Sequence, residues 1–309
     1  MRTVTQAEFG EPSVLEIIEV NRPVPDHGQV LIKVGAAGIN PVDVVVREGY
    51  PLLGEPPFTL GWDVAGVIES TGPGVSAFAP GDEVLGLLGF PHAGNTYADY
   101  VLASPNELIP KPAVLTMEQA GGLPLAALTA WQALVGIAGI SAGQRVLIHR
   151  AAGGVGHLAI QVAKTRGAYV IGTASTAKHD FLRSLGADEL IDYSTADFVH
   201  ETGAVDVVLD LLGGADAPRS AAVLRSGGLI VGAIGGNLGL TQERATELGV
   251  RFEVVSVRPS VHDLAQLSLL VESGQLTVHI DEAFPLAEVA KAHDFSASGH
   301  TTGKVVLVP

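Results

Sequence analysis

The stretch that most constrains the fold is residues 145–164, RVLIHRAAGGVGHLAIQVAK. It opens with the apolar run VLI, which is typical of a short buried strand. It closes with Leu158, Ile160, Val162 and Ala163, which recur at spacings that a helix would bury. Between the two lies AAGGVG, residues 151–156. The pattern therefore predicts a strand, a tight glycine turn and a helix.

A glycine turn between a strand and a helix is a common place to bind phosphate. Gly153 and Gly154 have no Cβ, so a pyrophosphate can approach the free N–H groups at the helix N-terminus. Gly156 lets the helix and the strand pack closely. Two features depart from the usual dinucleotide fingerprint, because Ala151 replaces its first glycine and Arg150 is unusual in such a loop. A tight turn in some other α/β protein is the alternative interpretation.

The composition limits the class of protein. The chain has 309 residues, of which 47% are hydrophobic and 17% charged, as expected of a compact globular protein. A net charge of −15 argues against nucleic acid or an anionic membrane as the main partner. Cysteine is absent, which excludes disulfides and thiolate metal sites. The N-terminal segment MRTVTQAEFG is no signal peptide, and no apolar run suits a membrane span, so we expect a cytoplasmic protein.

The predicted secondary structure changes along the chain. Residues 1–117 are rich in strand-like segments separated by proline and glycine, which predicts a small β-rich domain. From residue 118, strands alternate with helical segments, which predicts a doubly wound parallel sheet. A last strand, residues 303–308, needs a partner and is expected to return to the first domain. We therefore predict an α/β protein with one domain at 1–117 and 260–309 and a second at 118–259.

Several segments, in this order, resemble the zinc-independent quinone oxidoreductase branch of the medium-chain dehydrogenase/reductase superfamily. They span nearly the whole chain: AAGINPVD (36–43), GWDVAGV (61–67), GPGVSAFAPGDEV (72–84), TYADYV (96–101), AALTAWQAL (126–134), LIHRAAGGVG (147–156), RSLGADELIDY (183–193) and GKVVLV (303–308). The resemblance implies a GroES-like catalytic domain, a Rossmann domain, an active site in the cleft between them and a homodimer.

The resemblance also implies a set of residues that bind NADPH. Asn40 and Thr129 would lie near the nicotinamide, and residues 153–155 would hold the pyrophosphate. The cofactor-binding residues expected in this way are Asn40, Thr129, Gly153, Gly154, Val155, Ser175, Lys178, Tyr193, Leu212, Ala233, Ile234 and Lys304.

The expected preference for NADPH over NADH rests on the end of the second Rossmann strand. NAD enzymes usually place Asp or Glu there, about 20 residues after the glycine loop, whereas here no acid comes before Asp180. Ser175 and Lys178 can instead bind a 2′-phosphate through charge-assisted hydrogen bonds. The resemblance adds Tyr193 as a third partner. Alternatively, Lys178 is only a solvated residue in the first turn of a helix.

The residues of the substrate pocket depart from the family pattern. Well-studied members carry a tyrosine where Val45 stands, so no catalytic residue is assigned. Trp62 fills a place often held by a small residue and suggests a differently shaped pocket, for which Tyr50, Trp62 and Phe90 are the candidate wall residues. Zinc-containing relatives place cysteine where Asn40 stands and histidine where Trp62 stands, and neither an amide nor an indole is a normal zinc ligand. We therefore expect no catalytic metal.

Other polar residues have simpler interpretations. Asp43 and Asp63 could form an acid pair, but hydrogen-bonded structural carboxylates are the more ordinary expectation. His92 and His157 are expected at a loop and on a helix surface, and Tyr97 is expected to pack in the first domain. His149 could be either a structural histidine or one that touches the cofactor.

These observations predict an NADPH-dependent oxidoreductase that reduces a quinone or another conjugated carbonyl, with the cofactor as hydride source. One alternative is an ene reductase for a specific biosynthetic enone. The other is an NADPH-binding redox sensor without turnover, since one fold can support several functions.

Overall fold

The computed structural model describes residues 1–233 and 238–309, which form two compact units. Unit 1 contains Met1–Leu128, Arg258–Gly274 and Val278–Pro309, and unit 2 contains Thr129–Val257 and Gln275–Thr277. Unit 1 thus continues beyond residue 117, because the next helix, α2 (Met117–Gly122), packs against strands of the first unit. No helix in the described part of the chain is long and apolar enough to cross a bilayer.

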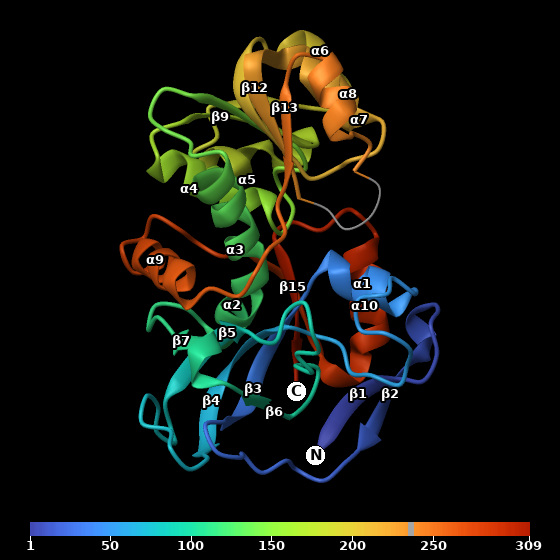
Figure 1. Ribbon diagram of the computed structural model, residues 1–309, viewed down its shortest axis with the longest axis vertical. Coiled ribbons are helices and arrows are strands. Elements are labelled where there is room, and N and C mark those ends of the chain that lie inside the picture. Colours follow the sequence, from blue (N-terminus) through green and yellow to red (C-terminus); the bar gives the residue numbers. More distant parts are fainter. Residues whose placement is uncertain (234–237) are drawn as a thin grey trace. The chain divides into compact units, whose positions relative to one another are not determined.

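Unit 1 is built on a seven-stranded sheet that joins the two ends of the chain (Figure 1). Its strands are β14 (Ile280–Pro285), β15 (Lys304–Val308), β3 (Val30–Ile39), β4 (Asp63–Thr71), β5 (Glu83–Leu87) and β7 (Leu108–Pro110) in that order, with β6 (Tyr100–Ala103) also paired to β3. The C-terminal strand β15 runs antiparallel to β3, with Val306 opposite Gly38. This register brings Lys304 beside the end of β3, where Asn40 follows.

Shorter elements complete unit 1. A two-stranded sheet pairs β1 (Arg2–Gln6) with β2 (Leu15–Glu19). The helices and single turns are η1 (Pro12–Val14), α1 (Pro41–Arg47), η2 (Pro105–Glu107), α2, α9 (Val261–Glu272), η6 (Leu286–Glu288) and α10 (Val289–Ala297), while α3 (Pro124–Trp131) crosses from unit 1 into unit 2. Helix α1 begins at Pro41 directly after Asn40, a position where proline is favoured because its missing N–H needs no partner there.

Unit 2 is a doubly wound parallel sheet of six strands (Figure 1). The strand order is β10 (Glu189–Ile191), β9 (Tyr169–Thr173), β8 (Arg145–Ile148), β11 (Val205–Asp210), β12 (Leu224–Gly232) and β13 (Arg251–Val254). This is the 3-2-1-4-5-6 order of a dinucleotide-binding fold, and the order reverses between β8 and β11. The predicted combination of a β-rich domain and a doubly wound parallel sheet is therefore confirmed.

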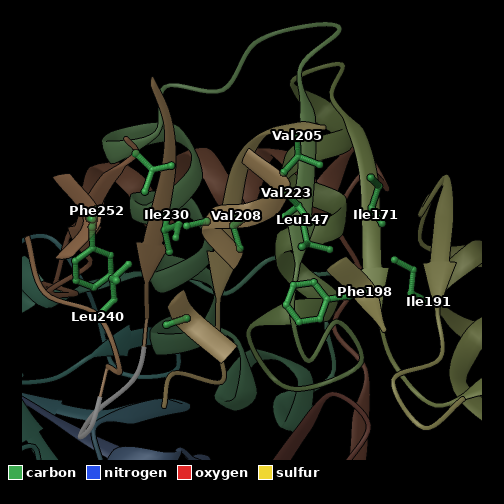
Figure 2. Close-up of a cluster of buried hydrophobic side chains, with 14 residues drawn as sticks. Leu147, Ile171, Ile191, Phe198, Val205, Val208, Val223, Ile230, Leu240 and Phe252 are labelled. Atoms are coloured by element: carbon green, nitrogen blue, oxygen red, sulfur yellow. The ribbon is translucent and has the colours of Figure 1, made fainter. Parts of the chain in front are cut away.

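The helices of unit 2 connect these strands. They are the π-helical turn Gln132–Ile137, α4 (Gly156–Thr165), η4 (Thr176–Lys178), α5 (His179–Ser184), α6 (Phe198–Glu201), α7 (Asp216–Ser220), η5 (Ala221–Val223) and α8 (Gln242–Glu247). Figure 2 shows part of the core, in which Leu147, Ile171, Val208 and Ile230 project from four neighbouring strands. These side chains are fully buried, so the sheet that carries the glycine loop rests on a tightly packed core.

Candidate functional site: a dinucleotide cradle and a buried polar network

The glycine loop follows β8 and leads into α4, as the sequence predicts. A Cβ at Gly156 would lie 2.4 Å from the carbonyl oxygen of Arg150, so only glycine fits this close approach. At Gly153 a Cβ would lie 3.3 Å from the same carbonyl oxygen, a close contact but a less severe one. The N–H groups of Gly154 and Val155 have no hydrogen-bond partner among the described residues. The loop therefore offers unpaired donors, as an anion-binding turn requires.

The other expected cofactor residues of unit 2 lie at the same edge of the sheet. Each follows the carboxyl end of a parallel strand: Gly153, Gly154 and Val155 follow β8, Ser175 and Lys178 follow β9, Tyr193 follows β10, Leu212 follows β11 and Ala233 follows β12. In open α/β sheets this edge, at the point where strand order reverses, is where ligands bind. Ile234 lies outside the described residues, and Thr129 lies on α3.

The carboxylate of Asp210 shapes the loop after β11. Its Oδ1 accepts hydrogen bonds from the N–H groups of Leu212 and Gly213, both at 2.9 Å, and its backbone carbonyl accepts one from Ala233 at 3.0 Å. Leu212 is left 40% exposed, and an exposed leucine at this edge can contact a ligand.

The expected 2′-phosphate site is organised by a carboxylate that the sequence analysis did not include. Asp192 accepts hydrogen bonds from the backbone N–H and the hydroxyl of Thr176, which follows Ser175. Hydrogen bonds from Ser194 and Thr176 hold the pKa of Asp192 well below its usual range. Asp192 thus fixes the first turn after β9, and Tyr193 beside it is 63% exposed.

Two histidines near the loop are structural. His149 is buried, with Nε2 3.0 Å from the Ser220 hydroxyl and Nδ1 3.3 Å from that of Thr173. Burial lowers its pKa, so the ring is neutral. The expectation that His157 lies on a helix surface is wrong. It is fully buried, with Nδ1 2.9 Å from the carbonyl oxygen of Gly153, because α4 is buried over nearly its whole length.

In unit 1 the expected residues Asn40 and Lys304 belong to one buried network. The Asn40 side chain donates from Nδ2 to Oδ2 of Asp63 at 2.9 Å, while its Oδ1 accepts from the Lys304 ammonium. The ammonium also donates to the carbonyl oxygen of Ile39 at 2.9 Å and lies 3.8 Å from Asp63. Lys304 is only 3% exposed. Its ammonium is therefore engaged inside unit 1.

Asp43 and Asp63 are both buried and both hydrogen-bonded, as expected of structural carboxylates. Asp43 accepts from the N–H groups of Asn40 at 2.8 Å and Gly61 at 3.1 Å, and Asp63 accepts from the N–H of Leu125 at 2.7 Å. Burial raises the pKa of Asp43 to about 7 and also raises that of Asp63. Lys304 opposes both increases because its positive charge stabilises the carboxylates, although burial lowers its own pKa.

The expected pocket residues have different environments. Trp62 is fully buried, donates from Nε1 to the carbonyl oxygen of His92 at 2.6 Å and packs edge-on against Phe90 at 5.5 Å. Its indole therefore presents no exposed face in this structure, which contradicts its expected place in a pocket wall. Tyr50 is 47% exposed, and Tyr97 is fully buried in unit 1 as expected. Of the three expected pocket residues, Tyr50 and the partly exposed Phe90 are therefore the ones with surface that a ligand could contact.

The side chains of Asn40 and Trp62 are not suitable ligands for a zinc ion. Asn40 already uses its amide oxygen to accept from Lys304, and the Trp62 indole can only donate. Among the described residues no three His, Asp or Glu side chains are grouped so as to hold a metal. The residues present therefore offer no ligand set of the kind that zinc dehydrogenases use.

Sequence reasoning did not find the ion pair between Asp63 and Lys304. A lysine directly before the apolar run VVLV was a possible signal, since a charged side chain within a buried strand needs a partner. The identity of that partner required the fold.

Comparisons with known proteins agree with this architecture. Residues 26–113 match the family model of the alcohol dehydrogenase GroES-like domain, and residues 185–307 match that of the zinc-binding dehydrogenases. The quinone oxidoreductase of Homo sapiens is 32% identical over 100% of this chain and 98% of its own length. The chloroplastic NADPH-dependent alkenal/one oxidoreductase of Arabidopsis thaliana is 37% identical over 100% of this chain and 80% of its own.

A solved structure is similar over the whole chain as well. The quinone oxidoreductase from Coxiella burnetii shares 38% identity and a TM-score of 0.94, covering 100% of this chain and 99% of its own. Together with the glycine loop, the sheet order and the amide in place of a zinc ligand, these similarities show that the chain belongs to the zinc-independent quinone oxidoreductase branch of the medium-chain dehydrogenase/reductase superfamily.

Proposed function

We propose that this protein is an NADPH-dependent reductase that transfers a hydride to a quinone or another conjugated carbonyl without a metal ion. The observation that carries the proposal is the dinucleotide cradle, formed where successive loops meet at one edge of the six-stranded sheet. It occurs in a chain whose relatives include quinone oxidoreductases and an alkenal/one oxidoreductase.

The proposal gives each group of residues a role. Bound NADPH supplies the hydride. The N–H groups of Gly154 and Val155 bind the pyrophosphate of NADPH, and Leu212 and Ala233 line the binding site of the cofactor. Asn40 and Thr129 lie toward the nicotinamide in the family, and we assign them the same role here.

The proposed substrate class follows from the side chains of Asn40 and Trp62, which stand where zinc-containing relatives place zinc ligands. Oxidation of a simple alcohol near neutral pH benefits from a Lewis acid that stabilises the alkoxide. Asn40 and Trp62 cannot hold one through the ligands that zinc prefers. A quinone or enone is already electrophilic at carbon, so a hydride from the cofactor and a proton from water or from a cofactor hydroxyl complete a two-electron reduction.

We also propose that Ser175, Lys178 and Tyr193 bind the 2′-phosphate and so favour NADPH over NADH. No acidic residue lies between the glycine loop and the end of β9, so nothing in that segment repels the phosphate. The hydroxyl of Ser175 makes no helix-capping hydrogen bond, and its turn is held by Asp192. We expect a homodimer, as in the family.

Two other functions remain to be separated by experiment. The similarity to an alkenal/one oxidoreductase favours a second candidate, an ene reductase that acts on one biosynthetic enone. An NADPH-binding redox sensor would use the same cradle without turnover.

Stopped-flow mixing of NADPH-loaded protein with a panel of quinones and enones distinguishes these functions. A quinone reductase oxidises many equivalents of NADPH with several quinones, and an ene reductase does so only with an enone. A single slow turnover with every compound would support the sensor. Activity on simple alcohols without activity on quinones or enones would refute the proposed function.

A further inference from the structure

The side-chain amide of Asn40 has a fixed orientation in unit 1. An ammonium can only donate hydrogen bonds and a carboxylate can only accept them. Oδ1 of Asn40 therefore faces Lys304, and Nδ2 faces Asp63. A flipped amide would place its NH₂ group against the ammonium and its oxygen against the carboxylate. The contact with Asp63 uses one of the two Nδ2 hydrogens of Asn40 and leaves the other for another partner.

Lys304 and Asp63 are themselves held in place. Lys304 is anchored by the carbonyl oxygen of Ile39 at 2.9 Å, and Asp63 by the N–H of Leu125 at 2.7 Å. Asn40, Asp63 and Lys304 are at most 3% exposed, so water does not screen these contacts. The pair thus forms a rigid clamp around the amide.

We propose that Lys304 and Asp63 are positioning residues that set the orientation of the Asn40 amide, and that Lys304 is not itself a cofactor ligand. The role of Asn40 toward the nicotinamide rests on the proposed function, whereas the clamp formed by Lys304 and Asp63 does not. When the clamp is released, the amide can rotate, so that its NH₂ group and its oxygen exchange places in part of the molecules. Small misplacements of this kind lower kcat more than they lower affinity.

The test compares Lys304→Met with a matched control, Lys111→Met. Lys111 also lies in unit 1 with a side chain only 5% exposed, and its ammonium donates to the carbonyl oxygen of Leu115 at 2.7 Å and pairs with Glu83 at 3.2 Å. It makes no contact with Asn40. Removal of Lys304 alone leaves a buried carboxylate without its counter-charge, so the double variant Lys304→Met/Asp63→Asn is measured as well.

The first readout is the pair of Asn40 Nδ2 hydrogens, observed by NMR of ¹⁵N-labelled protein without cofactor and assigned from an Asn40→Asp variant. We expect their shifts and hydrogen-exchange rates to change in both Lys304 variants and to remain as in the wild type in Lys111→Met. Unchanged signals in a folded Lys304 variant would overturn the clamp. This readout requires no enzymatic activity, so it decides the inference even if the wild type reduces no quinone and the proposed function fails.

The second readout separates positioning from binding. Both Lys304 variants should lose between about 10-fold and 100-fold in kcat, with the NADPH dissociation constant close to that of the wild type. A large loss of NADPH affinity, with unchanged Asn40 signals, would show that Lys304 binds the cofactor directly and would refute the inference.

Discussion

A buried histidine in unit 1 should make the stability of this protein depend on pH. His293 is fully buried on α10, with Nδ1 3.3 Å from Nη1 of Arg47 and its ring edge-on to Tyr97 at 5.8 Å. Because the guanidinium can only donate, Nδ1 must be unprotonated and the ring neutral. Burial and the positive charge of Arg47 lower the pKa of His293 from 6.5 to about 3.

The sign and size of the effect follow from this shift. Below pH 6.5 the unfolded chain binds a proton at this ring, and the folded chain does not until about pH 3. Stability present above pH 6.5 is therefore lost as the pH falls, by ~1.4 kcal/mol per pH unit and roughly 2 kcal/mol at pH 5. Asp43, whose raised pKa of about 7 makes the folded state take up a proton, acts in the opposite direction. Only a comparison with a variant isolates the histidine.

We therefore predict the behaviour of His293→Asn, whose Oδ1 can still accept from Arg47. Loss of ring packing should lower its free energy of unfolding at pH 8 by roughly 0.5–3 kcal/mol. At pH 5 the wild type has lost the contribution of the neutral ring, so the difference in free energy of unfolding between wild type and variant should shrink by about 2 kcal/mol or change sign.

Urea unfolding at both pH values measures this difference. A Trp131→Phe background leaves Trp62 as the tryptophan that reports on unit 1. His262→Asn, the same substitution at an exposed position, provides the matched control. An equal destabilisation by His293→Asn at pH 8 and pH 5 would refute the assigned pKa.

Three further predictions concern the dinucleotide cradle and the expected independence from metal. Lys178→Ala should weaken NADPH binding about 10- to 150-fold, through loss of a charged hydrogen bond, and leave NADH almost unchanged in fluorescence titrations. Equal losses for the two cofactors would contradict that assignment. Gly156→Ala places a Cβ 2.4 Å from the carbonyl oxygen of Arg150 and should lower the free energy of unfolding by ~1–3 kcal/mol. Gly136→Ala is the control, because its added Cβ would have no atom within 4 Å and should not lower that free energy. Dialysis against a chelator should leave quinone reduction intact, and a stoichiometric zinc ion required for turnover would disprove the metal-free mechanism.

Local patterns in the sequence predicted the features that depend on neighbouring residues. The apolar run before Ala151 and the spacing of Leu158 and Val162 predicted the strand, turn and helix, because these elements form from short-range contacts. The same reasoning misplaced His157. A polar residue is expected on the outer face of a helix, but α4 is covered on nearly all sides, and Nδ1 finds the carbonyl of Gly153.

Features that depend on distant parts of the chain could not be predicted in this way. Lys304 and Asn40 are separated by 264 residues and meet only because β15 pairs with β3. The burial of Trp62 depends on a loop that brings the carbonyl oxygen of His92 to its Nε1. No local periodicity records such long-range contacts, so the resemblance could name Lys304 but not its surroundings.

The arrangement of buried charges also bears on where the function of unit 1 lies. Burying Asp43, Asp63 and Lys304 is costly, and a well-packed apolar cluster of similar volume is often at least as stable. Stability alone is therefore a weak reason for this cluster. Each of its three charged side chains contacts Asn40, at the backbone N–H, at Nδ2 or at Oδ1. Asp63 and Lys304 contact the two ends of one side-chain amide, as the orientation of that amide requires, and Asp43 holds the backbone N–H of the same residue. Asn40 is also the residue that the family places at the nicotinamide. The energetic cost and the proposed chemistry thus concern the same side chain.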